Sequence, residues 1–372
     1  MADCTQNNFR SRLRISYDWS EVRDEWPCLG DIGPRISGFP FQTREWIDAW
    51  NRTIGPTTTT TPFFAIVETL EGMPMAFFPL QVARRCGVRS VEFIGKSITD
   101  YGAPLLVPGY DFAEIGETFW DGLLKKGPGF DLVYLRHVPA FVGASTNPCR
   151  TLGHEPSPMQ ARVATLTGDW KSFYKRTHSK STRSKLRRKF HNMAQMGEVR
   201  FQTAATTDEA LVILNRLFQM KSELMLAEHN TLSVPEHVEF YREMTRSCPE
   251  AVYVHALTVG GEIVAALWSV GTRGYYTSLL ASYAGGDWAR FSPGLLGFEQ
   301  AFAWCFEQGF EVYDFGLGDE AYKFRWCDRE LNLASVIRAR TVIGHAAAYY
   351  MKRKEAKTVR APAVNGHLAG AR

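Results

Sequence analysis

The chain has 372 residues, of which 45% are hydrophobic and 13% aromatic, and its formal net charge at pH 7 is +4. This composition is sufficient for one or two buried cores, and it excludes a largely disordered protein. The mild positive charge permits an acidic ligand but does not by itself indicate nucleic acid.

The cysteines and the apolar runs exclude several further classes. The seven cysteines are odd in number and form no C-x-x-C pair, which is typical of a reducing compartment rather than of a disulfide framework or a zinc site. No His, Cys and carboxylate set has metal-ligand spacing. No segment resembles a signal peptide or approaches the roughly 18 apolar residues of a membrane span. We therefore expect a cytoplasmic protein with no metal and no membrane span.

The first part of the chain has the pattern of a mixed sheet. Alternating apolar residues predict two strands joined by a turn within residues 62–83 and a third strand at 89–94. A helix with 3.6-residue periodicity follows at 112–126, and a buried strand follows at 131–138. Residues 140–160 are rich in turn formers and are the best candidate for a linker.

The second part has a similar order of elements. After a short strand and two helices, tight turns join three antiparallel strands, and a final strand–helix–strand unit predicts two parallel neighbours. The predicted elements are a strand at 161–166, a basic helical stretch at 170–196, a helix at 207–228, strands at 251–259, 262–270 and 275–282, a helix at 292–308 and a strand at 311–316. The similar order suggests a duplicated unit.

Residues 311–330, EVYDFGLGDEAYKFRWCDRE, have the glycine spacing of a dinucleotide-binding turn. However, Asp319 and Glu320 lie where the turn would have to accept a pyrophosphate, and like charges repel at that range. The residues after the turn have no helical apolar stripe, and too little chain remains for successive βαβ units. We therefore reject a dinucleotide site here.

The helix that begins near Ser292 is a better candidate for anion binding. Ser292 suits the N-cap, Pro293 suits the first helical position, and Gly294 would let a ligand approach the backbone closely. Arg290 could add a full positive charge to the partial charge of the helix N-terminus. A phosphodiester or pyrophosphate would then bind at this tip. The alternative is that Ser-Pro-Gly is simply a well-formed helix start.

Two motifs in this region resemble a known family. Residues 291–294 read F-S-P-G, and residues 314–323 read D-F-G-L-G-D-E-A-Y-K. They resemble the signature of GNAT acyltransferases of the CelD/FemAB-like branch, and the similarity extends over roughly residues 40–345. The resemblance implies an α+β fold of two tandem GNAT-like domains, each a mixed, mostly antiparallel sheet flanked by helices. One departure is that residues 290–294 lack the second glycine of the superfamily's donor loop, Q/R-x-x-G-x-G/A.

On this basis we expect an N-terminal GNAT-like domain at residues 1–160, a C-terminal acyltransferase domain at 161–350 and a basic, disordered tail at 351–372. The resemblance implies direct acyl transfer from acetyl-CoA or another acyl-CoA to an amine or hydroxyl. The expected acceptor is a saccharide, a cell-envelope precursor or a related small molecule. Alternatives are a Fem-type ligase that takes its aminoacyl group from tRNA, and a catalytically silent double domain that only binds ligands.

The resemblance also assigns candidate site residues in the second domain. The donor would contact Ser282 and Tyr283 at the end of one strand, where a backbone N–H stabilises the oxyanion, and also residues Arg290, Phe291, Ser292, Pro293 and Gly294. Asp319 is the first candidate for the general base, and Tyr322 and Lys323 are candidates for an acid or for substrate contacts. The alternative is that Asp319 pairs with Lys323, four residues on, and only fixes the loop.

Further candidates lie outside these motifs. Asp100 and Tyr101 could contact an acceptor, or they could be turn formers before Pro104. In the basic stretch, Arg183 and Arg187 could bind the phosphates of a substrate, or they could belong to a solvated cationic helix face. Few aromatic residues lie among these cations, so stacking on single-stranded bases has weak support. We expect His178, between basic residues, to be a surface histidine.

Overall fold

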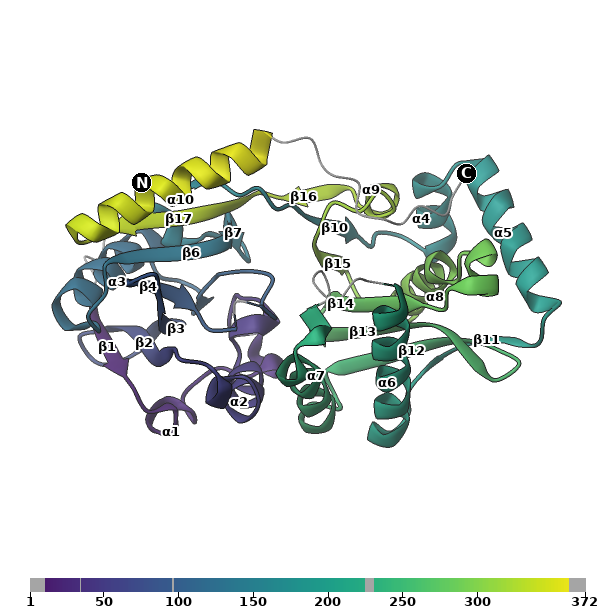
Figure 1. Cartoon of the computed structure of the whole chain (residues 1–372), viewed down its shortest axis with the longest axis horizontal. Helices are drawn as coiled ribbons and strands as arrows, with labels where there is room; N and C mark the ends of the chain where they lie inside the picture. Colours follow the sequence, from purple (N-terminus) through teal and green to yellow (C-terminus); the bar gives the residue numbers. More distant parts are fainter. Residues whose placement is uncertain (1–10, 34, 96, 225–230, 361–372) are drawn as a thin grey trace, which may run out of the picture. The chain divides into compact units, whose positions relative to one another are not determined.

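The computed structural model describes residues 11–33, 35–95, 97–224 and 231–360 (Figure 1). The described chain forms two compact units. The first contains residues 11–47, 58–158 and 333–360, and the second contains residues 48–57 and 159–332. Each unit has its own mixed sheet.

The first sheet begins with four antiparallel strands in chain order, and a parallel strand then follows. Its order is β1-β2-β3-β4-β6-β17-β9, with β5 paired to β3. β6 is parallel to β4, and β17 is antiparallel to β6. The bounds are β1 Ser11–Ser16, β2 Thr61–Thr69, β3 Pro74–Arg85, β4 Val88–Phe93, β5 Leu105–Leu106, β6 Leu132–Pro139, β9 Glu155–Pro156 and β17 Leu333–Ala339.

The second sheet repeats this arrangement. Its order is β11-β12-β13-β14-β15-β10-β16, with β15 parallel to β14 and β10 antiparallel to β15. The bounds are β10 Ala161–Thr165, β11 Val199–Thr203, β12 Val252–Val259, β13 Glu262–Thr272, β14 Tyr275–Tyr283, β15 Val312–Leu317 and β16 Arg329–Leu331. The tight turn between β12 and β13 depends on Gly260 and Gly261, whose φ angles are 57° and 89°.

In each sheet a helix connects the two parallel strands: α3 in the first and α8 in the second. In the first unit α10 packs on β17, and in the second α6 packs on β12, β13 and β14. The helices are α1 Trp19–Val22, α2 Arg44–Arg52, α3 Phe112–Lys126, α4 Trp170–Thr177, α5 Lys180–Ala194, α6 Thr207–Leu224, α7 Pro235–Ser247, α8 Pro293–Glu307, α9 Lys323–Trp326 and α10 Val342–Arg360. A 3-10 turn, η7 (Gly286–Phe291), precedes α8, and the hairpin of β7 (Phe141–Val142) and β8 (Ser145–Thr146) is separate from both sheets.

The strand that follows the parallel pair in the first sheet comes from the C-terminal part of the chain. β17 lies beyond all strands of the second sheet in sequence, yet it pairs with β6 of the first. The sequence-based boundaries assign residues 333–350 to the second domain, whereas the structure places them in the first unit. Residues 351–360, assigned to a disordered tail, form the last turns of α10, and Glu355 is buried there. Its Oε1 accepts hydrogen bonds from Tyr134 at 2.7 Å and Ser335 at 2.8 Å.

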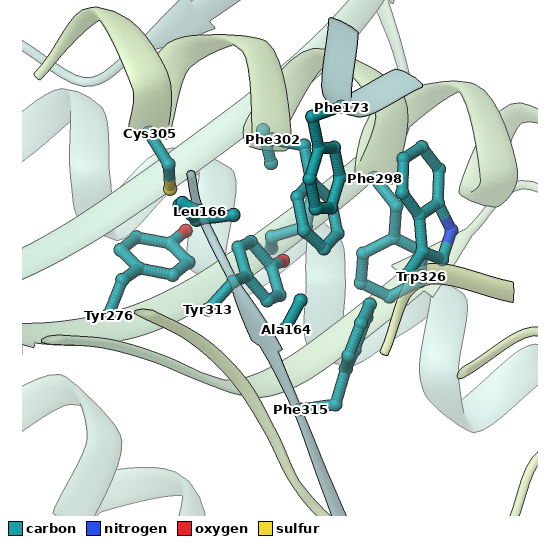
Figure 2. Close-up of a cluster of buried hydrophobic side chains, with 12 residues drawn as sticks. Ala164, Leu166, Phe173, Tyr276, Phe298, Phe302, Cys305, Tyr313, Phe315 and Trp326 are labelled. Carbon is teal, nitrogen blue, oxygen red and sulfur yellow. The ribbon is translucent and has the colours of Figure 1, made fainter. Parts of the chain in front are cut away.

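An aromatic core fixes α8 against the second sheet (Figure 2). The ring of Phe302 on α8 stacks on Tyr313 of β15, with ring centroids 4.0 Å apart, and on Trp326 of α9, at 4.4 Å. Phe298, one turn earlier on α8, packs edge-on against Phe315 of β15. Burying such large rings contributes more to stability than any other contact type. The core therefore sets the position of the α8 N-terminus relative to β14 and β15.

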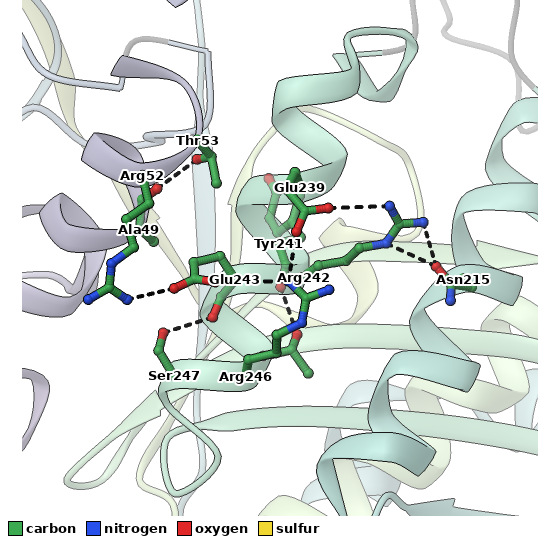
Figure 3. Close-up of polar contacts among 11 residues, drawn as sticks. Ala49, Arg52, Thr53, Asn215, Glu239, Tyr241, Arg242, Glu243, Arg246 and Ser247 are labelled. Carbon is green, nitrogen blue, oxygen red and sulfur yellow. Dashed lines mark hydrogen bonds and ion pairs between the residues drawn. The ribbon is translucent and has the colours of Figure 1, made fainter. Parts of the chain in front are cut away.

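A polar network on α7 holds other parts of the second unit (Figure 3). Arg52 at the end of α2 donates to Glu243 of α7 at 2.6 Å. Arg246 donates to Glu239 at 2.6 Å, and Arg242 donates to Asn215 of α6 at 2.8 Å. These pairs are partly exposed, so each contributes only about 0.2–1 kcal/mol. They orient α7 but do not supply the main stability of the unit.

The α+β class with two mixed sheets flanked by helices confirms the fold predicted from the sequence. The second-part strands and α8 lie close to their predicted positions. The basic stretch predicted as one helix is two helices, because the chain breaks at His178 and Ser179 caps α5. The helix predicted at 207–228 ends at Leu224, and residues 225–228 lie outside the described residues. The sequence analysis missed α7, β11 and β17.

Candidate active site

The two parallel strands of the second sheet separate after three residue pairs. β14 and β15 are paired only from Tyr275↔Val312 to Thr277↔Asp314. β14 then continues to Tyr283 along β13 alone, while β15 continues along β10. The register between β13 and β14 also shifts so that Leu279 has no partner, which is a β-bulge. Residues 278–283 therefore present a strand edge that no described strand covers.

The N-terminus of α8 has an unusual cap. Ser292 adopts a left-handed conformation with φ 55° and ψ 55°, and its hydroxyl does not cap the helix as we expected. Instead, Lys189 Nζ of α5 donates to Ser292 Oγ at 2.5 Å. Pro293 occupies the first helical position as predicted, and the first turn contains no acidic residue. The partial positive charge of this helix end is therefore not neutralised by a carboxylate of its own first turn.

Gly294 brings this helix tip against the uncovered edge of β14. A Cβ atom on Gly294 would lie 3.0 Å from Cδ1 of Tyr283, so the backbone of α8 lies directly on the tyrosine ring. Burial raises the pKa of Tyr283. The predicted donor-site residues of β14 and of α8 are thus neighbours in the structure. Ser282 is 6% exposed, and its Oγ has no hydrogen-bond partner among the described residues.

Positive charge surrounds the tip. Arg290 is exposed, with its guanidinium 4.8 Å from the ring centroid of the buried Phe291. Lys189 lies at the tip, and its pKa is lowered by burial and by the neighbouring charges of Arg188 and Lys185. A group that loses solvation and is repelled by like charges is stabilised by an incoming anion. The arrangement favours a phosphate or diphosphate ligand.

The D-F-G-L-G-D-E-A-Y-K motif forms two sets of contacts that hold the end of β15. The buried carboxylate of Asp314 accepts from Tyr275 Oη at 2.7 Å and from the backbone N–H of Gly316, also at 2.7 Å. Gly316 has a φ of 64°, a conformation that glycine adopts without strain. Asp314 therefore has a structural role, because it joins Tyr275 of β14 to the end of β15.

Lys323 makes the second set of contacts, and its partners differ from those expected. Its side chain is buried, and Nζ donates to the carbonyls of Phe315 at 3.2 Å and Leu317 at 2.7 Å. It also forms an ion pair with Glu320 at 2.9 Å. The alternative in which Lys323 pairs with Asp319 is therefore replaced by a pair with the next residue. Two backbone carbonyls and one carboxylate surround this ammonium, which marks Lys323 as a positioning residue.

The other two catalytic candidates precede this lysine in the chain. Asp319 is exposed just after β15. Tyr322 is partly buried, its ring stacks on Phe298 with centroids 5.0 Å apart, and burial together with the charge of Glu320 raises its pKa well above the usual value. A phenol in that environment stays protonated at neutral pH and can donate a hydrogen bond.

Two charged groups near the gap escaped the sequence analysis. Lys221 on α6 interacts electrostatically with Glu320 and with Lys323, and burial lowers its pKa. Glu320 is 41% exposed at its side chain despite its ion pair. Lys221 lies far from Glu320 and Lys323 in the sequence. The predicted elements did not indicate that the last turn of α6 approaches the end of β15, so the sequence could not identify this group of three charges.

The remaining predicted residues lie away from the gap or in other roles. Tyr101, in the first unit, is fully buried against Phe39 and Phe41, so it is a core residue with no exposed side-chain surface for an acceptor. Asp100 is half-buried beside it. In the second unit Arg187 is exposed on α5, and Arg183 donates to the backbone carbonyl of His178.

The expectation for His178 was wrong. Its side chain is 4% exposed and packs against Trp326, with ring centroids 4.2 Å apart. Burial, followed by the charges of Arg325 and Arg183, lowers its pKa to about 4. Within the described ranges no group of His, Cys, Asp and Glu residues could hold a metal ion, and no helix is long and apolar enough to span a membrane.

Comparison with known proteins supports this description of the second unit. A family model of the acetyltransferase (GNAT) domain matches residues 180–324. The crystal structure of FemX is similar with a TM-score of 0.59 at 9% identity, covering 91% of this chain and all of FemX. A conserved protein of unknown function from Bacteroides thetaiotaomicron has a TM-score of 0.53 at 8% identity, covering 88% of this chain and 100% of its own.

A comparison with curated protein sequences gave no match. Residues 180–324 of the second unit thus match the GNAT acetyltransferase domain model, and the chain has a fold similar to that of FemX. The first sheet repeats the strand arrangement of the second, so the GNAT-like arrangement is present twice in the described chain.

Proposed function

We propose that the protein transfers an acyl group, with acetyl-CoA as the first candidate donor, to an amine or hydroxyl of a small acceptor. The acceptor would be a saccharide, a cell-envelope precursor or a related molecule. The observation that carries the proposal is the α8 tip, which is open, basic and in contact with the uncovered edge of β14. An acyl-CoA combines the two chemical features that such a site fits, a diphosphate and a chain of amides ending in a thioester.

Each half of the donor would have its own contacts. The diphosphate would bind the N–H of Gly294, because Pro293 has none and the N–H groups of Ser292 and Leu295 already donate within the chain. Lys189 and Arg290 would add positive charge beside it. The amide groups of the pantetheine arm would pair with the free backbone groups of residues 278–283, as an added strand does. The thioester would then lie in the gap between β14 and β15, where a backbone N–H near Ser282 or Tyr283 could stabilise the oxyanion.

In the transfer step, the acceptor nitrogen or oxygen attacks the thioester carbon. A new C–N or C–O bond forms, the C–S bond breaks, and the proton lost by the acceptor balances the proton gained by the thiolate. Asp319 is the proposed base because its carboxylate is exposed at the end of β15. Tyr322 is proposed to donate a hydrogen bond to the departing thiolate, because its phenol remains protonated, and the thiolate takes its proton from solvent. Lys323 would hold Asp319 and Tyr322 in position, because it contacts Phe315 and Leu317 of β15 and Glu320 in the loop that follows.

Isothermal titration of acetyl-CoA into the wild-type protein and into an Arg290→Glu variant tests the donor site. We expect the charge reversal to weaken binding about tenfold, because a cation near the diphosphate becomes an anion. Arg84→Glu changes the net charge equally on an exposed residue of the first unit and should leave the affinity within twofold. Equal affinity of wild type and the folded Arg290→Glu variant would overturn the assignment of the tip.

A Fem-type ligase that uses aminoacyl-tRNA is the second candidate. The exposed cations of α5, beside the same helix tip, are the observation that supports it. This reaction predicts that tRNA, and not acetyl-CoA, raises the melting temperature in a concentration-dependent way. A thermal-shift titration with both ligands separates the two candidates. If neither ligand raised the melting temperature, both candidate functions would be rejected.

A further inference from the structure

The positive charge of this protein is concentrated on two helices. Residues 170–197 contain nine lysines and arginines and no aspartate or glutamate. Since the whole chain has a net charge of +4, these nine charges leave a net charge of −5 for all other residues. We call this set the cationic surface; its members are Lys171, Lys175, Arg176, Lys180, Arg183, Lys185, Arg187, Arg188 and Lys189.

These cations are not neutralised by the protein. Seven of the nine are exposed, and Arg183 and Lys189 are partly buried. Within the described ranges none of them forms an ion pair with a carboxylate, whereas many arginines elsewhere do. Arg183 and Arg176 donate to backbone or hydroxyl oxygens instead. So many uncompensated like charges repel one another, and an anionic partner would relieve that repulsion.

The surface is held rigidly. Phe173 on α4 and Leu186 and Met193 on α5 are buried, and they fix one side of each helix to the unit. Asp169 and Ser179 cap the two helix N-termini through hydrogen bonds to Ser172 and Thr182. The cations therefore project from well-formed helices rather than from a loose segment. A preorganised charge pattern is typical of a binding surface.

The cationic surface is continuous with the proposed donor site. α5 packs against η7, the turn that leads into α8. Lys189, on the same helix as five other members, reaches Ser292 at the α8 tip. The fifteen residues of α5 extend over about 22 Å. A donor bound at the tip would therefore have any attached carrier resting on α5.

The chemistry of the surface favours an acidic protein over two other polyanions. Its aromatic neighbours are buried or only partly exposed, so fully exposed rings that could stack on the bases of a single strand are missing from the described part of α4 and α5. Met196, just past α5, is the exposed large apolar side chain of the described stretch 170–197, and insertion into a lipid surface normally uses several such residues. What remains on the exposed faces is lysine, arginine and short polar side chains, which suit the carboxylates of an acidic helix.

We propose that the acyl donor is presented by an acidic carrier protein, whose phosphopantetheine arm enters at the α8 tip while its acidic face lies on the cationic surface. The inference rests on the proposed function, because the arm would use the contacts assigned there to acyl-CoA. It goes beyond that function in naming the donor's carrier. The arm ends in the same thioester and carries one phosphate, which Lys189 and Arg290 can bind.

Binding measurements test this without a known acceptor. Fluorescence anisotropy would compare an acetyl-loaded bacterial acyl carrier protein, its form without the arm, total tRNA and anionic vesicles as ligands. We expect the loaded carrier to bind, to lose affinity as salt is raised, and to bind at least tenfold less well to a Lys175→Glu/Lys180→Glu variant. Acetyl-CoA affinity should change less than twofold, since these two exposed residues are not among the cations that act on Lys189 at the tip. The matched control is Arg84→Glu/Lys126→Glu, at two exposed cations of the first unit.

The outcomes separate the two proposals. If acetyl-CoA binds but the loaded carrier does not, the carrier proposal fails and the proposed function stands. If neither binds, the proposed function fails. Binding of tRNA or vesicles that is lost in the double variant, with no carrier binding, would assign the surface to that polyanion and overturn the inference. Equal carrier binding by wild type and the double variant would also overturn it.

Discussion

The two units share an arrangement of strands but differ at the helix tip where the parallel strands part. In the first unit α3 begins at a cap formed by Asp111, whose carboxylate accepts from Ala113, and Glu114 follows in the first turn. In the second unit α8 begins at Ser292 with no acidic residue in its first turn and with Lys189 bonded to the capping hydroxyl. A carboxylate already occupies the anion position of α3. The same strand arrangement thus carries a helix tip with its own carboxylates in one copy and a tip without a first-turn carboxylate in the other.

The gaps beyond the two parallel pairs also differ. In the first unit β4 ends at Phe93, two residues after its last pairing with β6. In the second, β14 runs six residues past its last pairing with β15. A long uncovered edge can accept an extended ligand, and a short one cannot. On this comparison only the second unit has room for an extended ligand beside its parallel strands, and the following experiments test the difference.

The largest expected effect concerns the contacts of Lys323. Lys323→Met removes the donor to two carbonyls and the partner of Glu320, and we expect it to lower the free energy of unfolding by about 3 kcal/mol. Urea denaturation measures the change. The same substitution at Lys352, whose pair with Glu155 in the first unit is exposed, should cost less than about 1 kcal/mol. Equal losses would show that the Lys323 contacts are dispensable.

A second experiment uses pH. Burial lowers the pKa of His255 to about 3, and His178 is lowered to about 4, both in the second unit. Each imidazole is neutral in the folded protein, whereas in the unfolded chain it takes up a proton below its usual pKa of about 6.5. The free energy of unfolding is therefore highest above pH 6.5 and decreases as the pH falls toward 4. His255 alone predicts a loss of about 2 kcal/mol between pH 7 and pH 5.

Urea denaturation at both pH values measures this loss, and a His255→Leu variant should lose less stability over the same interval. His191→Leu, at an exposed position on α5, is the matched control and should retain the full dependence. If the dependence survived in His255→Leu and His178→Leu alike, the buried histidines would not be its source.

Ser292→Asp gives the second tip the chemistry of the first. Aspartate tolerates the left-handed conformation and would pair with Lys189, so the fold should be retained. The new carboxylate should lower acetyl-CoA affinity about tenfold, which is about 1.4 kcal/mol. Ser292→Asn, without the charge, serves as the control in the same titration and should bind within threefold of wild type. Unchanged affinity in Ser292→Asp would mean that the difference between the tips does not govern anion binding.

The smallest effect is expected at the other tip. Asp111→Ala removes the cap of α3 and should destabilise the protein by about 1 kcal/mol, measured as a shift of the urea midpoint. Acetyl-CoA affinity should be unchanged, because the site lies in the second unit. A variant that instead gained a second binding event in titration would show that Asp111 alone closes the first copy.

The sequence predicted local features well where neighbouring residues determine them. The glycine turn at Gly260 and Gly261, the helix start at Pro293 and the parallel return to β15 all follow from short-range chemistry. The spacing offered Asp319 as one possible partner of Lys323, whereas the structure pairs Lys323 with Glu320 and with backbone carbonyls of β15, which a sequence cannot indicate. Helix α7 was missed although Pro235 stands at its first position, a signal that a closer reading could have used.

Long-range pairing was beyond the sequence for a physical reason. β17 is an ordinary apolar run, and nothing within it distinguishes pairing with β6 from pairing with any nearer strand. In the same way, the approach of Lys221 to Glu320 depends on how α6 packs on the sheet. Such contacts require the positions of elements far apart in the chain.

The position of β17 affects how the protein can be synthesised and divided. Because the first sheet includes a strand that is translated after the whole second sheet, it lacks that strand until residues 333–339 have left the ribosome. A fragment ending near residue 160 would expose the edge of β6, and a fragment starting there would carry β17 and α10 with their apolar sides unburied. The two halves should therefore aggregate when produced separately and remain in solution when co-expressed.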